Sequence, residues 1–136
     1  MQVRYGVVAA VAAGMLAAGC GSDESSSEAS KEETATPQQA IREIAAVRQG
    51  LDQAIATYRS GDKAAADQQV GDTYLQHFEI VEGPLEEADK ELNEELEDGI
   101  REELRGLIKD GAPKAQVEKL HEEIAAELDK AEAALR

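Results

Sequence analysis

The side chains best suited to chemistry lie together in the segment Gly71–Pro84. At about 100° per residue, His77 lies roughly 40° from the centre of the apolar stripe of its helix, so we expect it to point into the interior. A buried histidine is either satisfied by a neighbouring side chain or recruited to bind a metal or transfer a proton. Glu82 lies at the edge of the stripe, Glu79 points further towards solvent, and Tyr74 offers a hydroxyl to either arrangement. The candidate metal ligands are therefore His77, Glu79 and Glu82, with Tyr74 as a weaker one.

A second motif, Glu118-Lys119-Leu120-His121, has the Glu-x-x-His spacing of carboxylate-bridged di-iron bundles. Such a site needs two of these motifs and two further glutamates, and here Tyr74 stands three residues before His77. Glu118 also lies about 120° from the apolar centre of its helix and faces water. We therefore keep Glu118 and His121 as weaker candidates, and an oxygen-consuming di-iron enzyme as the least favoured hypothesis.

The acidic segment 94–103 favours a solvated helix face, with pairs such as Glu97 and Arg101 four residues apart. Its carboxylates suit hard cations, but they are spread over an exposed face. No phosphate-binding loop and no serine-histidine-aspartate arrangement is present, so we expect no enzyme activity. The formal net charge of -15 disfavours partners such as nucleic acid and anionic lipid headgroups.

The first nineteen residues have the three parts of a secretion signal: the basic Arg4, an apolar run, and small residues before Cys20. The sequence MLAAGC resembles a bacterial lipobox, with Ala17 where leucine is usual. This resemblance implies that Cys20 is lipid-modified and anchors the chain to the extracytoplasmic face of a membrane in the cell envelope. Residues 20–36 are polar and rich in serine and glutamate, and we expect a disordered tether there.

Residues 37–136 carry the helical pattern of a single domain. A capping box at Thr36 starts a helix that ends near Gly61, and Asp62 caps a second helix running to about Glu82. We expect Gly83-Pro84 to close that helix and residues 85–88 to form a short connection. Asp89 caps a third helix, and the turn around Gly111 precedes a fourth that starts at Pro113.

No segment alternates with a strand period, so the predicted fold is all-α, an antiparallel up-down-up-down four-helix bundle. The tight turn near Gly61 pairs the first two helices as a hairpin. This register brings together apolar pairs such as Leu51 with Val70 and Ile44 with Phe78.

The segment Gly71–Leu135 resembles the extracytoplasmic helical region that precedes the membrane domain of bacterial high-affinity iron permeases. The matching features are the run from Tyr74 through Phe78-Glu79 to Glu82, then Pro84-Leu85, and the Gly111-Ala112-Pro113 loop with its leucine-rich last helix. The resemblance implies iron capture or delivery, with Glu79 and Glu82 as ligands. Because we expect no membrane-spanning helix in this chain, it does not imply permeation.

Two functions follow as the main hypotheses. The first is a lipid-anchored envelope protein that binds iron or assists an iron permease. The second is a non-catalytic interaction or scaffold lipoprotein that binds no metal, for which we expect an exposed apolar strip.

Overall fold

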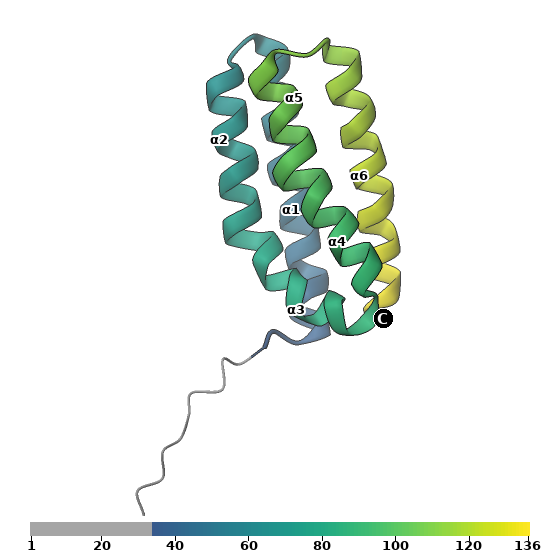
Figure 1. Ribbon diagram of the computed structural model, residues 1–136. Helices are drawn as coiled ribbons and strands as arrows, with labels where there is room; N and C mark the ends of the chain where they lie inside the picture. Colours follow the sequence, from purple (N-terminus) through teal and green to yellow (C-terminus); the bar gives the residue numbers. More distant parts are fainter. Residues whose placement is uncertain (1–33) are drawn as a thin grey trace, which may run out of the picture.

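In the computed structural model, which describes residues 34–136, the chain forms four helical rods that lie side by side (Figure 1). No strand occurs in this part of the chain, so the all-helical prediction is confirmed. The predicted signal peptide, Cys20 and nearly all of the tether lie outside the described residues. The elements are α1 (Pro37–Ser60), α2 (Lys63–Thr73), η1 (Tyr74–Phe78), α3 (Glu79–Ala88), α4 (Lys90–Asp98), η2 (Gly99–Leu104), α5 (Arg105–Asp110) and α6 (Lys114–Ala134).

A side-chain cap starts α1 and a left-handed glycine ends it, as the sequence predicts. The Thr36 hydroxyl accepts from the backbone N–H of Gln39, and the Gln39 side chain accepts from the backbone N–H of Thr36. Gly61 ends the helix with φ of 103°, a left-handed conformation that glycine adopts without steric cost. The Asp62 carboxylate then accepts from the N–H of Ala65 and starts α2.

The second rod, made of α2, η1 and α3, is longer than the sequence predicts. Pro84 lies inside α3, and residues 85–88 are helical rather than a connection. Proline removes one backbone hydrogen bond and strains the preceding turn, at a cost of about 3 kcal/mol. Here Val81, Pro84 and Leu85 are all buried, and this burial offsets that cost.

A single residue, Asp89, joins the second rod to the third, which is made of α4, η2 and α5. Its backbone N–H donates to the Leu85 carbonyl at 2.7 Å, and its carboxylate caps α4 at the N–H of Leu92. The predicted cap at Asp89 is therefore confirmed. The third rod ends at Gly111, whose φ is 70°, and α6 begins at Lys114, one residue later than predicted.

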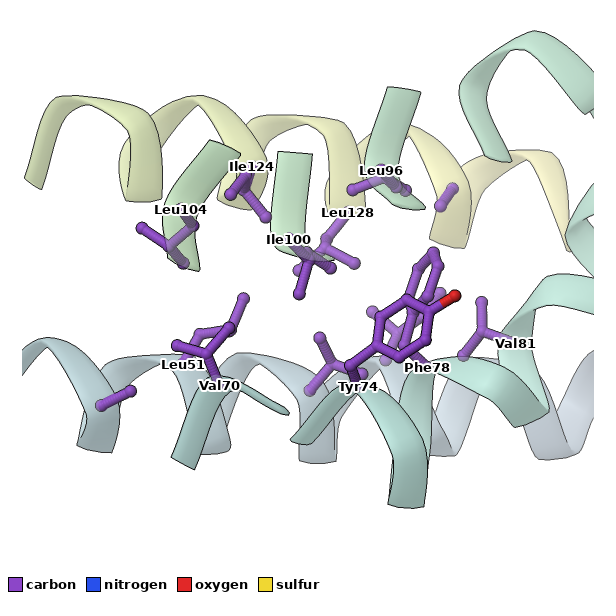
Figure 2. Close-up of a cluster of buried hydrophobic side chains, with 14 of the residues drawn as sticks. Leu51, Val70, Tyr74, Phe78, Val81, Leu96, Ile100, Leu104, Ile124 and Leu128 are labelled. Carbon is purple, nitrogen blue, oxygen red and sulfur yellow. The ribbon is translucent and has the colours of Figure 1, made fainter. Parts of the chain in front are cut away.

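All four rods contribute to one apolar core, part of which is shown in Figure 2. Phe78, Ile100 and Leu104 are fully buried, as are Ile44 and Leu51 of α1. Side chains of α6, including Ile124 and Leu128, close the opposite side of the cluster (Figure 2).

The two middle rods each contain a segment of wider, π-helical turn, η1 and η2. The buried residues of the third rod recur every four positions, at Leu92, Leu96, Ile100, Leu104 and Ile108. In an ideal α-helix each four-residue step rotates the stripe by about 40°, so this stripe would leave the core within a few turns. A π-helical turn, with its i→i+5 bonding, accommodates more residues and restores the alignment. The buried residues of α1 alternate steps of three and four, and α1 contains no π segment.

Contacts between α1 and the second rod agree with the predicted hairpin register. A Cβ atom built on Gly50 would lie 2.2 Å from the Oγ1 atom of Thr73, so the absent side chain of Gly50 allows this close approach. Further along, the Glu43 carboxylate lies 2.7 Å from Nδ1 of His77. Within residues 34–136 no helix is long and apolar enough to cross a membrane.

Deleting Glu103 provides a test of the π-helical turn. Glu103 is exposed, and its loss would let η2 relax to an α-helix in which the step from Ile100 to Leu104 shortens to three residues, so Leu104 and Ile108 would still face the core. We therefore expect the deletion variant to fold, with a free energy of unfolding in urea titrations close to that of the wild type. Glu103→Ala is the control and should change stability little; a deletion variant that loses several kcal/mol relative to Glu103→Ala would contradict the account.

Candidate functional site

The segment Gly71–Pro84 forms one wall of an open groove of about 360 Å³, which we call the Tyr74 groove. The opposite wall comes from the third rod. The lining residues are Gly71, Tyr74, Leu75, Glu79 and Glu82 of the second rod, and Glu97, Arg101 and Arg105 of the third.

The two π-helical segments supply central residues of this groove. η1 begins with Tyr74, and η2 carries Arg101, whose guanidinium carbon lies 6.0 Å from the centroid of the Tyr74 ring. This distance is within the range of a cation–π interaction. π-Helical turns often occur at functional sites, and here they bring an aromatic ring and a cation together across two rods.

Tyr74 joins the core to the groove. Its ring packs against Phe78 with the ring centroids 5.6 Å apart, and only 7% of the residue is exposed (Figure 2). Its hydroxyl donates a hydrogen bond to a carboxylate oxygen of Glu82. Burial and the neighbouring Glu82 raise the pKa of Tyr74 well above its usual value. The phenol is therefore protonated at neutral pH and acts as a donor rather than as a phenolate ligand.

Glu82 is half-buried, and its surroundings disfavour its charge. Burial, followed by repulsion from Glu97 and Glu79, raises the pKa of Glu82 above its ordinary value of 4.5. The Tyr74 hydrogen bond and Arg101 act in the opposite direction but do not outweigh these effects. The groove thus holds three carboxylates close enough to repel one another.

Arginine side chains supply the positive charge of the groove. Arg101 donates to Glu97 at 2.7 Å, which confirms the pairing predicted from their spacing, and lies 3.4 Å from Glu102. Arg105 donates to Asp67 of α2 at 2.8 Å, and this bond lowers the pKa of Asp67. Arg105 pairs with Asp67, which also lies 3.8 Å from Lys109, so Arg101 is the main cation facing Glu79, Glu82 and Glu97 in the groove.

His77 does not join these residues, and the prediction that it points into the interior is wrong. Its side chain is 35% exposed and pairs with Glu43 of α1. It lines a different groove, between α1 and the second rod, together with polar residues such as Gln49 and Gln76. The rotation assumed for a regular α-helix fails here because His77 lies within η1, where each residue turns the helix by less than 100°.

Glu118 and His121 also bind separate partners. The Glu118 carboxylate accepts from Nε of Arg59 at 2.6 Å, and Nε2 of His121 lies 3.0 Å from the Asp52 carboxylate. Within residues 34–136, no three histidine, cysteine, aspartate or glutamate side chains are arranged to hold a metal ion. Of the predicted ligands, Tyr74, Glu79 and Glu82 share the Tyr74 groove, whereas His77, Glu118 and His121 lie elsewhere.

The groove residues of the third rod were not among the predicted site residues. Glu97 and Arg101 were interpreted only as a surface pair, because their spacing along one helix does not reveal which rod faces them. The signal available in the sequence was that Glu97 and Arg101 stand four residues apart, next to residues of the buried stripe. Chemically, the assembled groove offers carboxylates, a phenol donor and an apolar edge, which is suited to binding a positively charged group.

Comparison of the chain with protein-family models, curated proteins and solved structures finds no match.

Replacing Glu82 with glutamine tests the electrostatics of the groove. Since the folded state raises the pKa of Glu82, ionisation above pH 4.5 costs folding free energy, and Glu82→Gln removes that cost. We expect a higher melting temperature for the variant at pH 7, with the gain disappearing as the pH falls below about 4, where both side chains are neutral.

Thermal melts of the full chain followed by circular dichroism measure this difference, and Glu122→Gln on the exposed face of α6 is the control. A variant that melts lower than the wild type at pH 7 would show that the hydrogen bond from Tyr74 to the charged carboxylate dominates.

Proposed function

We propose that this chain is a non-catalytic, lipid-anchored protein of the cell envelope whose helical domain binds a protein partner. The observation that carries the proposal is the exposure of Leu75 and Ile80, which are 59% and 38% exposed. They are the exposed large hydrophobic side chains of residues 34–136, and both lie in the segment Gly71–Pro84.

The position of these two side chains supports a binding role. A π-helical turn joins residue i to residue i+5, so Leu75 and Ile80 are about one turn apart along the second rod. Leu75 also lines the Tyr74 groove, beside Glu79 and Glu82. We call Leu75, Ile80 and this edge of the groove the Leu75 surface. It combines an apolar contact with unbalanced negative charge, and a partner with an apolar side chain next to a basic one complements it.

The relative direction of the four helical rods is part of the same proposal. We infer an antiparallel up-down-up-down four-helix bundle from the one-residue connection at Asp89 and from the short turns at Gly61 and Gly111. Such a bundle gives the Leu75 surface a rigid support.

An anchor at Cys20 would hold this surface near a membrane. Thr34, the first described residue, lies beside Gly83, with its Cγ2 atom 3.0 Å from a Cβ atom built there. The chain therefore enters the domain next to α3, a few turns from Leu75. If the predicted tether of about fifteen residues is a flexible coil, it would hold this end roughly 20 Å from an anchor at Cys20. A membrane protein with an extracytoplasmic surface, such as an iron permease, fits a partner at this distance.

Photo-crosslinking in cells tests the partner. A benzophenone amino acid at position 75 should give one dominant adduct in the membrane fraction, because the side chain points away from the core. The same amino acid at Ala133, an exposed position of α6, is the control and should not give that adduct. Cys20→Ala should weaken the adduct by releasing the chain from the membrane. Identical adduct patterns at positions 75 and 133 would contradict the proposal.

Iron binding is a second candidate function, because Glu79, Glu82 and Glu97 line one groove with Tyr74, although their carboxylates are not arranged to hold a metal ion. Oxygen ligands suit ferric iron. The ion would have to displace Arg101 from Glu97, and the protonated Tyr74 weighs against a phenolate ligand. The resemblance to the iron permease region supports the same candidate.

Calorimetric titration of the full chain with chelated ferric iron, then ferrous iron and calcium, tests this second function. Iron binding at the groove predicts saturable, near-stoichiometric binding, weaker for calcium and lost in Glu79→Gln with Glu82→Gln. His77→Ala should bind as the wild type, because His77 lines another groove. Weak, salt-sensitive binding of every cation alike would contradict an iron site and show that the acidic residues form only a solvated surface.

A further inference from the structure

A second groove, with an apolar base, lies between the third rod and α6, which are neighbours in Figure 1. Its volume is about 460 Å³, and we call it the α5–α6 groove. Leu107 and Leu120 line it, and both are partly buried against the core, so their outer surfaces form its base. Gly106 also lines the groove and adds no side chain.

Gly106 keeps this groove open. A Cβ atom built at this position meets no other heavy atom within 4 Å, in contrast to Gly50, where a Cβ atom would collide with Thr73. Close packing between rods therefore does not require a glycine at 106. Glycine within a helix lowers the stability of the helix by about 1 kcal/mol relative to alanine. At position 106 the missing side chain leaves free space above the apolar base.

The rim formed by the third rod is acidic. Glu102, Glu103 and Asp110 line it and are exposed. On the α6 rim, Lys119 pairs with Glu123 on the same helix, so that side is neutral. An apolar base beside an acidic rim is complementary to an amphipathic helix with apolar residues on one face and lysine or arginine along one edge.

We propose that the α5–α6 groove binds a basic amphipathic helix of a partner protein. Residues 102–110 extend over about 12 Å of helix, enough to contact two turns of a docked helix. A second copy of this chain is a poor occupant, because a symmetric contact would bring two chains of net charge -15 against each other, with no basic face within residues 34–136 to match the acidic rim. This interaction is separate from the Leu75 surface and goes beyond the proposed function.

The test uses two substitutions of one glycine. Gly106→Leu fills the groove, whereas Gly106→Ala adds one methyl group and leaves most of it open. Both residues are better helix formers than glycine, so both variants should melt at or above the wild-type temperature. If Gly106→Leu keeps the wild-type melting temperature, its loss of binding cannot be attributed to a loss of folding.

The probe is a fluorescein-labelled 18-residue amphipathic peptide of leucine, alanine and lysine, titrated with the full-length chain by fluorescence anisotropy. We expect saturable binding by the wild type and Gly106→Ala, and at least tenfold weaker binding by Gly106→Leu. Leu75→Ser should bind as the wild type, so failure of this groove and failure of the Leu75 surface are distinguishable.

The contribution of charge to peptide binding is tested with a matched pair of double variants. Glu103→Gln with Asp110→Asn should weaken binding several-fold, whereas Glu86→Gln with Glu87→Gln, which changes the net charge equally on α3, should not. Equal binding by Gly106→Leu, no saturable binding by the wild type, or equal affinity for a peptide with glutamate in place of lysine would each overturn the proposal. Self-association of the free chain that Gly106→Leu abolishes would also overturn it, in favour of a homodimer interface.

Discussion

The packing of this domain depends on keeping an apolar stripe with a four-residue repeat against the core. An α-helix has 3.6 residues per turn, so a strict four-residue repeat drifts around its surface. The third rod follows this repeat from Leu92 to Ile108, and the second follows it from Ala66 to Phe78. In both, a π-helical turn keeps the buried residues aligned. Burying these side chains outweighs the poorer backbone geometry, since each contributes about 1.5–3 kcal/mol.

The same turns determine the polar chemistry of the Tyr74 groove. η1 places Tyr74 with its ring in the core and its hydroxyl on Glu82, and η2 places Arg101 against that ring. Burial first, and then repulsion from Glu97 and Glu79, raises the pKa of Glu82 in this groove. Arg105, by contrast, pairs with Asp67, which also lies near Lys109, and ties α5 to α2. The groove therefore retains an unbalanced negative charge that a partner or a cation can neutralise.

Two surfaces of the domain are suited to binding, for different physical reasons. On the second rod, large apolar side chains are exposed beside carboxylates, and the entry point of the chain at Thr34 lies close by. Between α5 and α6, the missing side chain of Gly106 leaves an apolar base open beside an acidic rim. Both proposed surfaces would favour a positively charged partner, in keeping with the acidic composition of the whole chain.

Local sequence was sufficient to predict the helical class, the capping box at Thr36, the caps at Asp62 and Asp89, and the turns at Gly61 and Gly111, because each depends on neighbouring residues. Prediction failed at Pro84 and His77. Pro84 remains helical because Leu85, one residue beyond it, is buried by the other rods. His77 faces α1 because the packing of a four-residue stripe changes the helical rotation locally. Only the tertiary structure decided that Glu97 and Arg101 meet Tyr74 and Glu82, since side chains on separate rods become neighbours through packing, which no spacing along the chain encodes.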